Sequence, residues 1–132
     1  MTVMKVSIFA TGSRKTASAK VWLAPGKGEV KINNQKAKEY LGRDDLVDVV
    51  LMPFKTTGLE GQYNIVCKVI GGGVASQAAA IALGTSRALV AKNEELRKTL
   101  KGAGLLKRDP REKERMKYGL AKRRKRFQWT KR

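Results

Sequence analysis

Residues 63–91, YNIVCKVIGGGVASQAAAIALGTSRALVA, contain the signals that decide the fold. The first eight are a short apolar run, which predicts a buried strand. Three glycines follow at 71–73, and apolar residues then recur at spacings of three and four through 74–91. This spacing predicts an amphipathic helix with one face in the core. The segment therefore predicts a strand, a tight turn and a long helix in succession, and with them a mixed α and β fold.

The segments before this unit alternate between apolar and polar residues. The alternation at 6–10 and again at 16–23 has a period of two, which is typical of half-buried strands. Residues 25–28, PGKG, are a turn signal, and a short strand is expected at 29–32. We expect the second and third of these strands to form a β-hairpin.

Two further helices are expected on either side of the central unit. Asp44 and Asp45 precede a run of apolar residues, and carboxylates stabilise the first turn of a helix, so a helix is predicted over 43–52. Pro53 is expected to end it. A second, short helix is predicted over 94–100, after an asparagine suited to cap it.

Charge is spread unevenly along the chain of 132 residues. Lys and Arg number 29 against 11 Asp and Glu, which gives a net charge of +18. Residues 1–100 carry +7 of this, and residues 101–132 carry +11. Apolar residues become sparse from residue 105. The conformational entropy lost on ordering that part is therefore not offset by burial in a core. We expect a globular RNA-binding body at 1–104 and a basic extension at 105–132 that is disordered when free.

The composition argues against an enzyme. There is no histidine and only one cysteine, which removes His–Cys zinc sites, Ser–His–Asp triads and disulfide frameworks. Cys67 lies in the buried strand and is expected to be an inert thiol. The cluster of Asp44, Asp45 and Asp48 lacks the spacing of a calcium loop, and helix first-turn charges explain it better. We expect no catalytic residue, no metal and no cofactor.

Clustered cations and two aromatic residues in the extension indicate nucleic acid. Residues 122–126, KRRKR, are five consecutive cations, and Phe127 and Trp129 follow at a spacing that places both rings on one side of an extended chain. Alone, the cation run also fits a localisation signal, a solvated tail or a membrane-surface patch. Arg14 and Lys15 lie in an expected loop that suits a phosphate. The glycine turn at 71–73 exposes backbone N–H groups, and both a phosphate site and a plain tight turn fit it.

Five strings in this sequence resemble small-subunit ribosomal protein nine of bacterial or plastid type. They are TGSRKTA at 11–17, GGGVASQA at 71–78, SRALV at 86–90, GLLKRDPRE at 104–112 and TKR at 130–132. The resemblance covers essentially the whole chain. It implies an α+β fold, a two-layer α/β sandwich in which a mixed four-stranded sheet packs on helices, followed by a long basic extended C-terminal tail.

The resemblance also implies a function. A member of this family is a structural constituent of the small ribosomal subunit, binds the 3′ domain of the ribosomal RNA in the subunit head beside other head proteins, and extends its tail to the peptidyl-site tRNA. The implied location is the cytoplasmic ribosome, or the stroma for a plastid-encoded chain, with no membrane and no small-molecule substrate. The alternative is a free-standing, non-specific nucleic-acid-binding chaperone, which would be found away from ribosomes.

From the residues and the resemblance together, we expect two sets of contacts. The tRNA contacts are Lys131 and Arg132 at the chain end. The ribosomal RNA contacts are basic, glycine and aromatic residues of the body and the extension: Arg14, Lys15, Lys20, Gly71, Gly72, Gly73, Arg108, Arg111, Lys113, Arg115, Lys117, Lys122, Arg123, Arg124, Lys125, Arg126, Phe127 and Trp129.

Overall fold

The computed structural model describes residues 7–131. Five strands form one mixed sheet in the spatial order β1-β2-β5-β3-β4. The strands are β1 (Ile8–Arg14), β2 (Ala17–Pro25), β3 (Val30–Ile32), β4 (Gln35–Lys36) and β5 (Tyr63–Ile70), and the helices are α1 (Ala37–Leu41), α2 (Asp44–Thr57), α3 (Val74–Lys92) and α4 (Leu96–Gly102). Neighbouring strands are antiparallel except β3 and β5, which are parallel. The α+β class and the mixed sheet on helices are thus confirmed.

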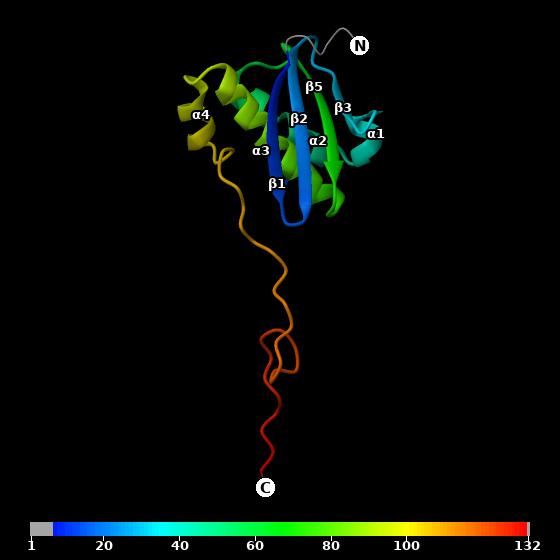
Figure 1. The fold of residues 1–132 in the computed structure, drawn as a ribbon, viewed down its shortest axis with the longest axis vertical. Coiled ribbons are helices and arrows are strands. Elements are labelled where there is room, and N and C mark those ends of the chain that lie inside the picture. Colours follow the sequence, from blue (N-terminus) through cyan, green and yellow to red (C-terminus); the bar gives the residue numbers. More distant parts are fainter. Residues whose placement is uncertain (1–6, 132) are drawn as a thin grey trace.

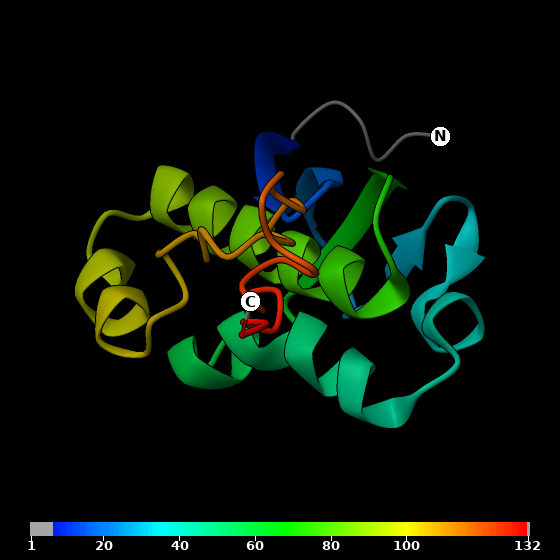
Figure 2. The same ribbon diagram turned by 90° about the horizontal axis from the view of Figure 1, so that it is seen from below.

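The helices cover one face of the sheet (Figures 1 and 2). α3 packs on β1 and β2, and α2 packs beside α3. The inward residues of β2 and β5 are apolar, and they meet the buried side of α3 to form one core. Since burial of apolar area is the main stabilising contribution to folding, this strand–turn–helix unit holds the body together.

α3 is the core helix. Its length and mean hydropathy of 1.2 would suit a membrane span, but 67% of the apolar window is buried inside the body, as expected for the central helix of a packed domain. Glycine allows its close approach to β1. A Cβ added at Gly12 would lie 2.0 Å from the Ala80 carbonyl oxygen, and one at Gly84 would lie 2.7 Å from Val21 Cγ2.

The prediction that the second and third strands form a β-hairpin is wrong. β2 and β3 are not neighbours, because β5 lies between them and pairs with both. The loop that joins them bonds to β5 instead: Asn64 Oδ1 accepts the N–H groups of Gly28 and Glu29 at 3.0 Å, and Gly26 N–H donates to the Gln62 carbonyl at 3.1 Å. Local alternation could not reveal this pairing, because β5 is more than thirty residues further along the chain.

Two other expectations need correction. The sheet has five strands and not four, because the two-residue β4 pairs with β3 through a turn at Asn33 and Asn34. The helix expected to end at Pro53 runs through it to Thr57. Proline removes one helical hydrogen bond, but Phe54 is buried and stacks on Tyr63 with ring centroids 6.3 Å apart, which favours continuing the helix. The strand at 63–70, the helix at 74–91 and the short helix near 94–100 are confirmed with small shifts.

Beyond α4 the chain leaves the body. Within the described residues 103–131 there is no helix or strand, and the segment runs away from the body as a long extension with one small loop (Figure 1). Leu105 and Leu106 still pack against the core, so the extension starts from a fixed point. Asp109 accepts a hydrogen bond from the Arg111 backbone N–H at 3.0 Å, as a helix cap would, but no helix follows it.

Candidate nucleic-acid interface

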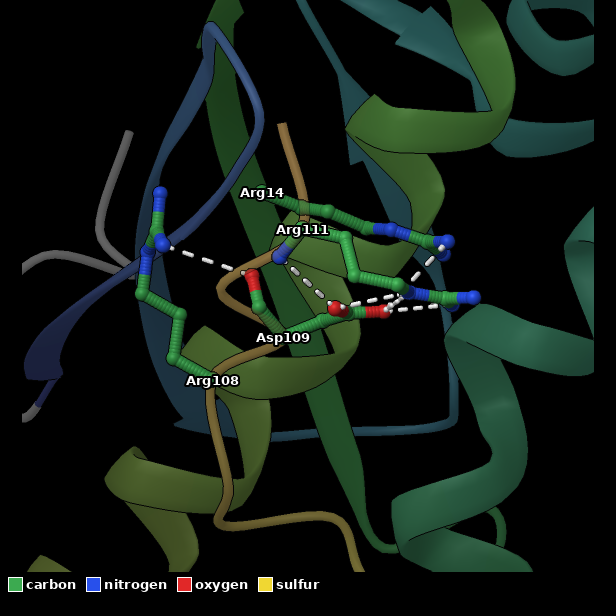
Figure 3. A network of polar contacts seen from close by, with 4 residues as sticks. All are labelled: Arg14, Arg108, Asp109 and Arg111. Carbon is green, nitrogen blue, oxygen red and sulfur yellow. Dashed lines mark hydrogen bonds and ion pairs between the residues drawn. The ribbon is translucent and has the colours of Figure 1, made fainter. Parts of the chain in front are cut away.

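The extension begins at a polar network on the β1 edge of the sheet (Figure 3). Arg108 Nε donates to Ser13 Oγ at 2.8 Å, and Arg14 Nη2 lies 3.7 Å from Asp109 Oδ2. Arg111 Nη2 donates to the same carboxylate oxygen at 2.6 Å. Hydrogen bonds from the Arg111 side chain and backbone hold the pKa of Asp109 well below its usual range. Arg14, which precedes Asp109 by 95 positions, is therefore brought to the start of the extension.

This network lies beside the β1–β2 turn and the glycine turn. Lys15 is exposed in the β1–β2 turn with a left-handed φ of 52°. A Cβ on Gly72 would lie 2.9 Å from Ala17 Cβ, so the glycine turn lies against the start of β2. Gly72 also has a φ of +64°, which favours glycine. We use the name basic end for the site formed by Arg14, Lys15, the glycines 71–73, Arg108 and Arg111.

The glycine turn has a structural role in the packing of the body. Gly71 and Gly72 permit contact with the β1–β2 turn, and Gln77 Nε2 donates to the Gly71 carbonyl at 2.9 Å. Gly73 is the N-cap of α3 and provides no side-chain cap. The turn thus lies against the β1–β2 turn, which carries Lys15.

Lys20 is separate from the basic end. It lies in the middle of β2 on the sheet face that the helices leave bare, paired in register with Lys68 on β5. Its neighbour Trp22 on the same face is half-buried and stands opposite Phe9. Lys20 was predicted as an RNA contact from the sequence, but its neighbours Lys68, Trp22 and Phe9 were not. Period-two alternation was the available signal, because it assigns the even-numbered residues of β2 to one face.

Further along the extension, Glu114 arranges three cations around a small loop. Its carboxylate accepts hydrogen bonds from Lys117 Nζ and from Arg124 Nε, the latter at 2.8 Å, and its backbone carbonyl accepts one from Arg123 Nε. The bonds from Lys117 and Arg124 lower the pKa of the Glu114 carboxyl. The loop closes where Ala121 N–H donates to the Lys125 carbonyl at 2.8 Å. The structural role of Glu114 was missed because a carboxylate in a basic run gives no pattern of its own.

The remaining expected contacts of the extension are exposed. Phe127 is 68% exposed and Trp129 is 80% exposed, so both rings are available to an aromatic partner. Lys131 is exposed, while Arg132 lies outside the described residues. The other expected contact cations that are exposed are Lys113, Arg115, Lys122, Lys125 and Arg126.

The groups considered for metal or acid chemistry have structural partners. Asp44 and Asp45 lie in the first turn of α2, as expected, and Asp48 accepts a hydrogen bond from Lys55 at 3.2 Å. Cys67 is buried, as expected, and burial raises the pKa of its thiol to about 12, which favours the neutral form. Within residues 7–131 no group of three metal-ligating side chains gathers.

Comparison with known proteins shows where the chain belongs. The family model described as ribosomal protein S9/S16 matches residues 12–132. The small ribosomal subunit protein uS9 of Syntrophobacter fumaroxidans is 48% identical over 124 residues, a span that covers 94% of this chain and 95% of that protein. The matched range includes the basic end, α3 and the whole extension. The chain belongs to the ribosomal protein S9/S16 family.

Proposed function

We propose that this chain is a structural protein of the small ribosomal subunit that binds ribosomal RNA through its basic end and extension and contacts peptidyl-site tRNA through its last residues. The observation that carries the proposal is the extension itself. It holds most of the net charge, projects away from the body and is tied to β1 only at its start (Figure 1). Family membership supports the structural role in the small subunit.

The charge of the extension suits the phosphate backbone of RNA. Each Lys or Arg that neutralises a phosphate releases a counterion, so a segment with a net charge of +11 gains affinity with every contact. The three cations around Glu114 are held in a loop, which spreads charge over several directions. This arrangement favours a partner that surrounds the extension, as the 3′ domain of the RNA in the subunit head would, with other head proteins nearby.

The aromatic side chains add a second kind of contact. Phe127 and Trp129 are exposed and stand two residues apart, so their rings can stack on unpaired bases. Burying both rings in RNA would also remove large apolar surfaces from water. Their exposure on the free chain is consistent with a partner that covers them in the subunit.

The end of the chain is suited to a ligand that comes and goes. Fully extended, residues 119–132 span roughly 45 Å at ~3.3 Å per residue, which exceeds the ~13 Å radius of gyration of a body of about 100 residues. Lys131 and Arg132 can therefore reach a site that the body does not touch. Arg132 provides a planar guanidinium that binds a phosphate with two hydrogen bonds.

Deletion of residues 130–132 tests this division of roles. The shortened chain is expected to enter small subunits as well as the full chain, because the basic end and the run at 122–126 are intact, while binding of peptidyl-site tRNA by those subunits weakens. The K98Q/K101Q variant is the control, because it removes two exposed cations on α4. Failure of the shortened chain to enter subunits, or unchanged tRNA binding, would contradict the proposal.

A further inference from the structure

One surface of the body has no role in the proposal above. The helices pack on one side of the sheet only, and the opposite side is bare in Figure 1. We use the name open face for that side of β1, β2, β5 and β3, whose residues include Phe9, Thr11, Lys20, Trp22, Lys31, Lys68 and Ile70. Phe9 is 52% exposed and Ile70 is 73% exposed, and Phe9 adjoins the half-buried Trp22 on the same face.

The strand register arranges these residues in rows. Phe9 pairs with Trp22, and their ring centroids lie 5.3 Å apart at an interplanar angle of 46°. Two positions further along β2, Lys20 pairs with Lys68 on β5. The aromatic row and the lysine row are separated by one pleat repeat, about 7 Å. Two adjacent, mutually tilted aromatic rings thus lie next to a pair of cations.

The two lysines place like charges side by side, and neither forms a salt bridge within residues 7–131. Directly opposed side chains on neighbouring antiparallel strands have Cβ atoms about 5 Å apart, and like charges at that position destabilise a sheet. Lys31 on β3 is a further exposed cation on this face. None of the five described strands contains Asp or Glu, so no strand residue offsets these charges. A bound anion would offset them.

We propose that the open face is a second RNA-binding surface, at which Phe9 and Trp22 stack on unpaired bases while Lys20 and Lys68 bind the adjoining phosphates. The inference rests on the proposed function in taking RNA as the partner, but it concerns residues that the extension does not include. Bases stack on exposed aromatic side chains of a sheet, and lysines track the backbone. A protein partner is disfavoured because lysine is depleted in protein–protein interfaces.

A photocrosslinking amino acid placed in assembled small subunits tests the contact. The probe replaces Thr11, which is exposed on the open face and pairs in register with Lys20. In separate variants it replaces Gln128 in the extension, or Met52 on the helical side as the control. We expect crosslinks to ribosomal RNA from positions 11 and 128 and none from position 52. Crosslinks from position 11 to protein, or to nothing, would overturn the inference.

The same experiment separates the two proposals. RNA crosslinks from position 128 without any from position 11 would leave the proposed function of the extension intact and overturn the open face. RNA crosslinks from position 11 alone would support the open face and overturn the extension as an RNA-binding segment. If neither probe meets RNA, both proposals are wrong.

Charge neutralisation gives an independent measurement on the isolated full-length chain. We expect K20Q/K68Q to lower affinity for small-subunit ribosomal RNA about tenfold at 0.15 M salt, because two phosphate contacts are lost. K98Q/K101Q removes the same charge from α4 and is expected to change affinity no more than about twofold. The Tm of K20Q/K68Q should stay the same or rise, since a repulsion is removed. Equal losses of affinity in the two variants would overturn the inference.

Discussion

Gly12 shows how one missing side chain permits the body to form. Its α carbon faces α3 so closely that a Cβ there would lie 2.0 Å from the Ala80 carbonyl oxygen and 2.5 Å from the Gly84 nitrogen. Both are backbone atoms, so neither can rotate away. The strand and the helix would have to separate, and the core contacts between them would weaken.

We therefore expect Gly12→Ala to lower the free energy of unfolding by about 3 kcal/mol or more, the upper range for overpacking a core. Urea unfolding of the full chain is the measurement. Gly102→Ala is the matched control, because nothing lies within 4 Å of a Cβ there and alanine is the better helix former. A similar midpoint for the two variants would show that β1 and α3 are not packed as described.

Cys67 is expected to be chemically silent in the folded chain. The thiolate is the reactive form, and burial raises the pKa of this thiol to about 12, so almost none is ionised at pH 8. Iodoacetamide should leave the native protein unlabelled during a period that labels the urea-unfolded protein completely. Labelling of the native chain at the rate of a free cysteine would mean that β5 is not buried.

At the scale of elements, local signals predicted the pieces better than their pairing. The run at 63–70 and the helix after it follow directly from periodicity, because each buries its own apolar face. The insertion of β5 between β2 and β3 depends on contacts between distant residues, such as Asn64 with Gly28. The continuation of α2 through Pro53 depends on the buried packing of Phe54 on Tyr63, which no local rule includes.

For the candidate interface too, the residues could be predicted from the sequence but their contacts within the folded chain could not. The cations and exposed rings of the extension could be named from composition, since they need no partner within the chain. Composition could not predict the contact of Arg14 with Asp109 or the arrangement of cations around Glu114. These salt bridges depend on how the chain folds in three dimensions. RNA binding by any of these residues stays a prediction.

The attachment of the start of the extension to β1 is expected to depend on the carboxylate of Asp109. Asp109→Asn removes the ion pairs to Arg14 and Arg111, so trypsin should cleave after Arg111 and Lys113 several times faster than in the parent chain. Hydrogen bonds from Arg111 lower the pKa of Asp109 well below its usual range, so the carboxylate is ionised at the alkaline pH of the assay and keeps these contacts until the pH falls well below the ordinary aspartate pKa.

Glu112→Gln is the control for that measurement. It removes one exposed carboxylate from the same segment, and Glu112 does not take part in the network around Asp109. Because Glu112 flanks the bonds after Arg111 and Lys113, and an acidic neighbour slows trypsin, both variants are also compared at the bond after Arg115, where we expect Glu112→Gln to match the parent chain. Equal acceleration in both variants would mean that lost negative charge, and not the lost contacts, exposes the extension.

For the whole molecule, the net charge of +18 separates into a body and an extension with different tasks. The body has a core and covers one side of its sheet with helices, while the extension has cations and aromatic rings without a core. The basic end joins the two parts at Asp109. This division explains why a chain of 132 residues can carry so many like charges and still fold.

RNA binding by the extension is expected to depend strongly on salt. Residues 122–132 contain seven cations, so their contribution to the slope of log affinity against log salt is at most about −5 on single-stranded RNA. K125Q/R126Q should reduce the steepness of the slope by about 1.4. Fluorescence anisotropy with a small-subunit ribosomal RNA fragment provides the values. Affinity that does not change with salt would contradict the electrostatic account.

The central claim is that the extension is bound to RNA within the small subunit, and limited trypsin digestion tests it most directly. Purified full-length chain and intact small subunits are digested side by side, and cleavage between residues 107 and 132 is followed by mass spectrometry. The account predicts rapid cleavage of the extension in the free chain and protection of the same bonds in the subunit. Equal cleavage in both would contradict it.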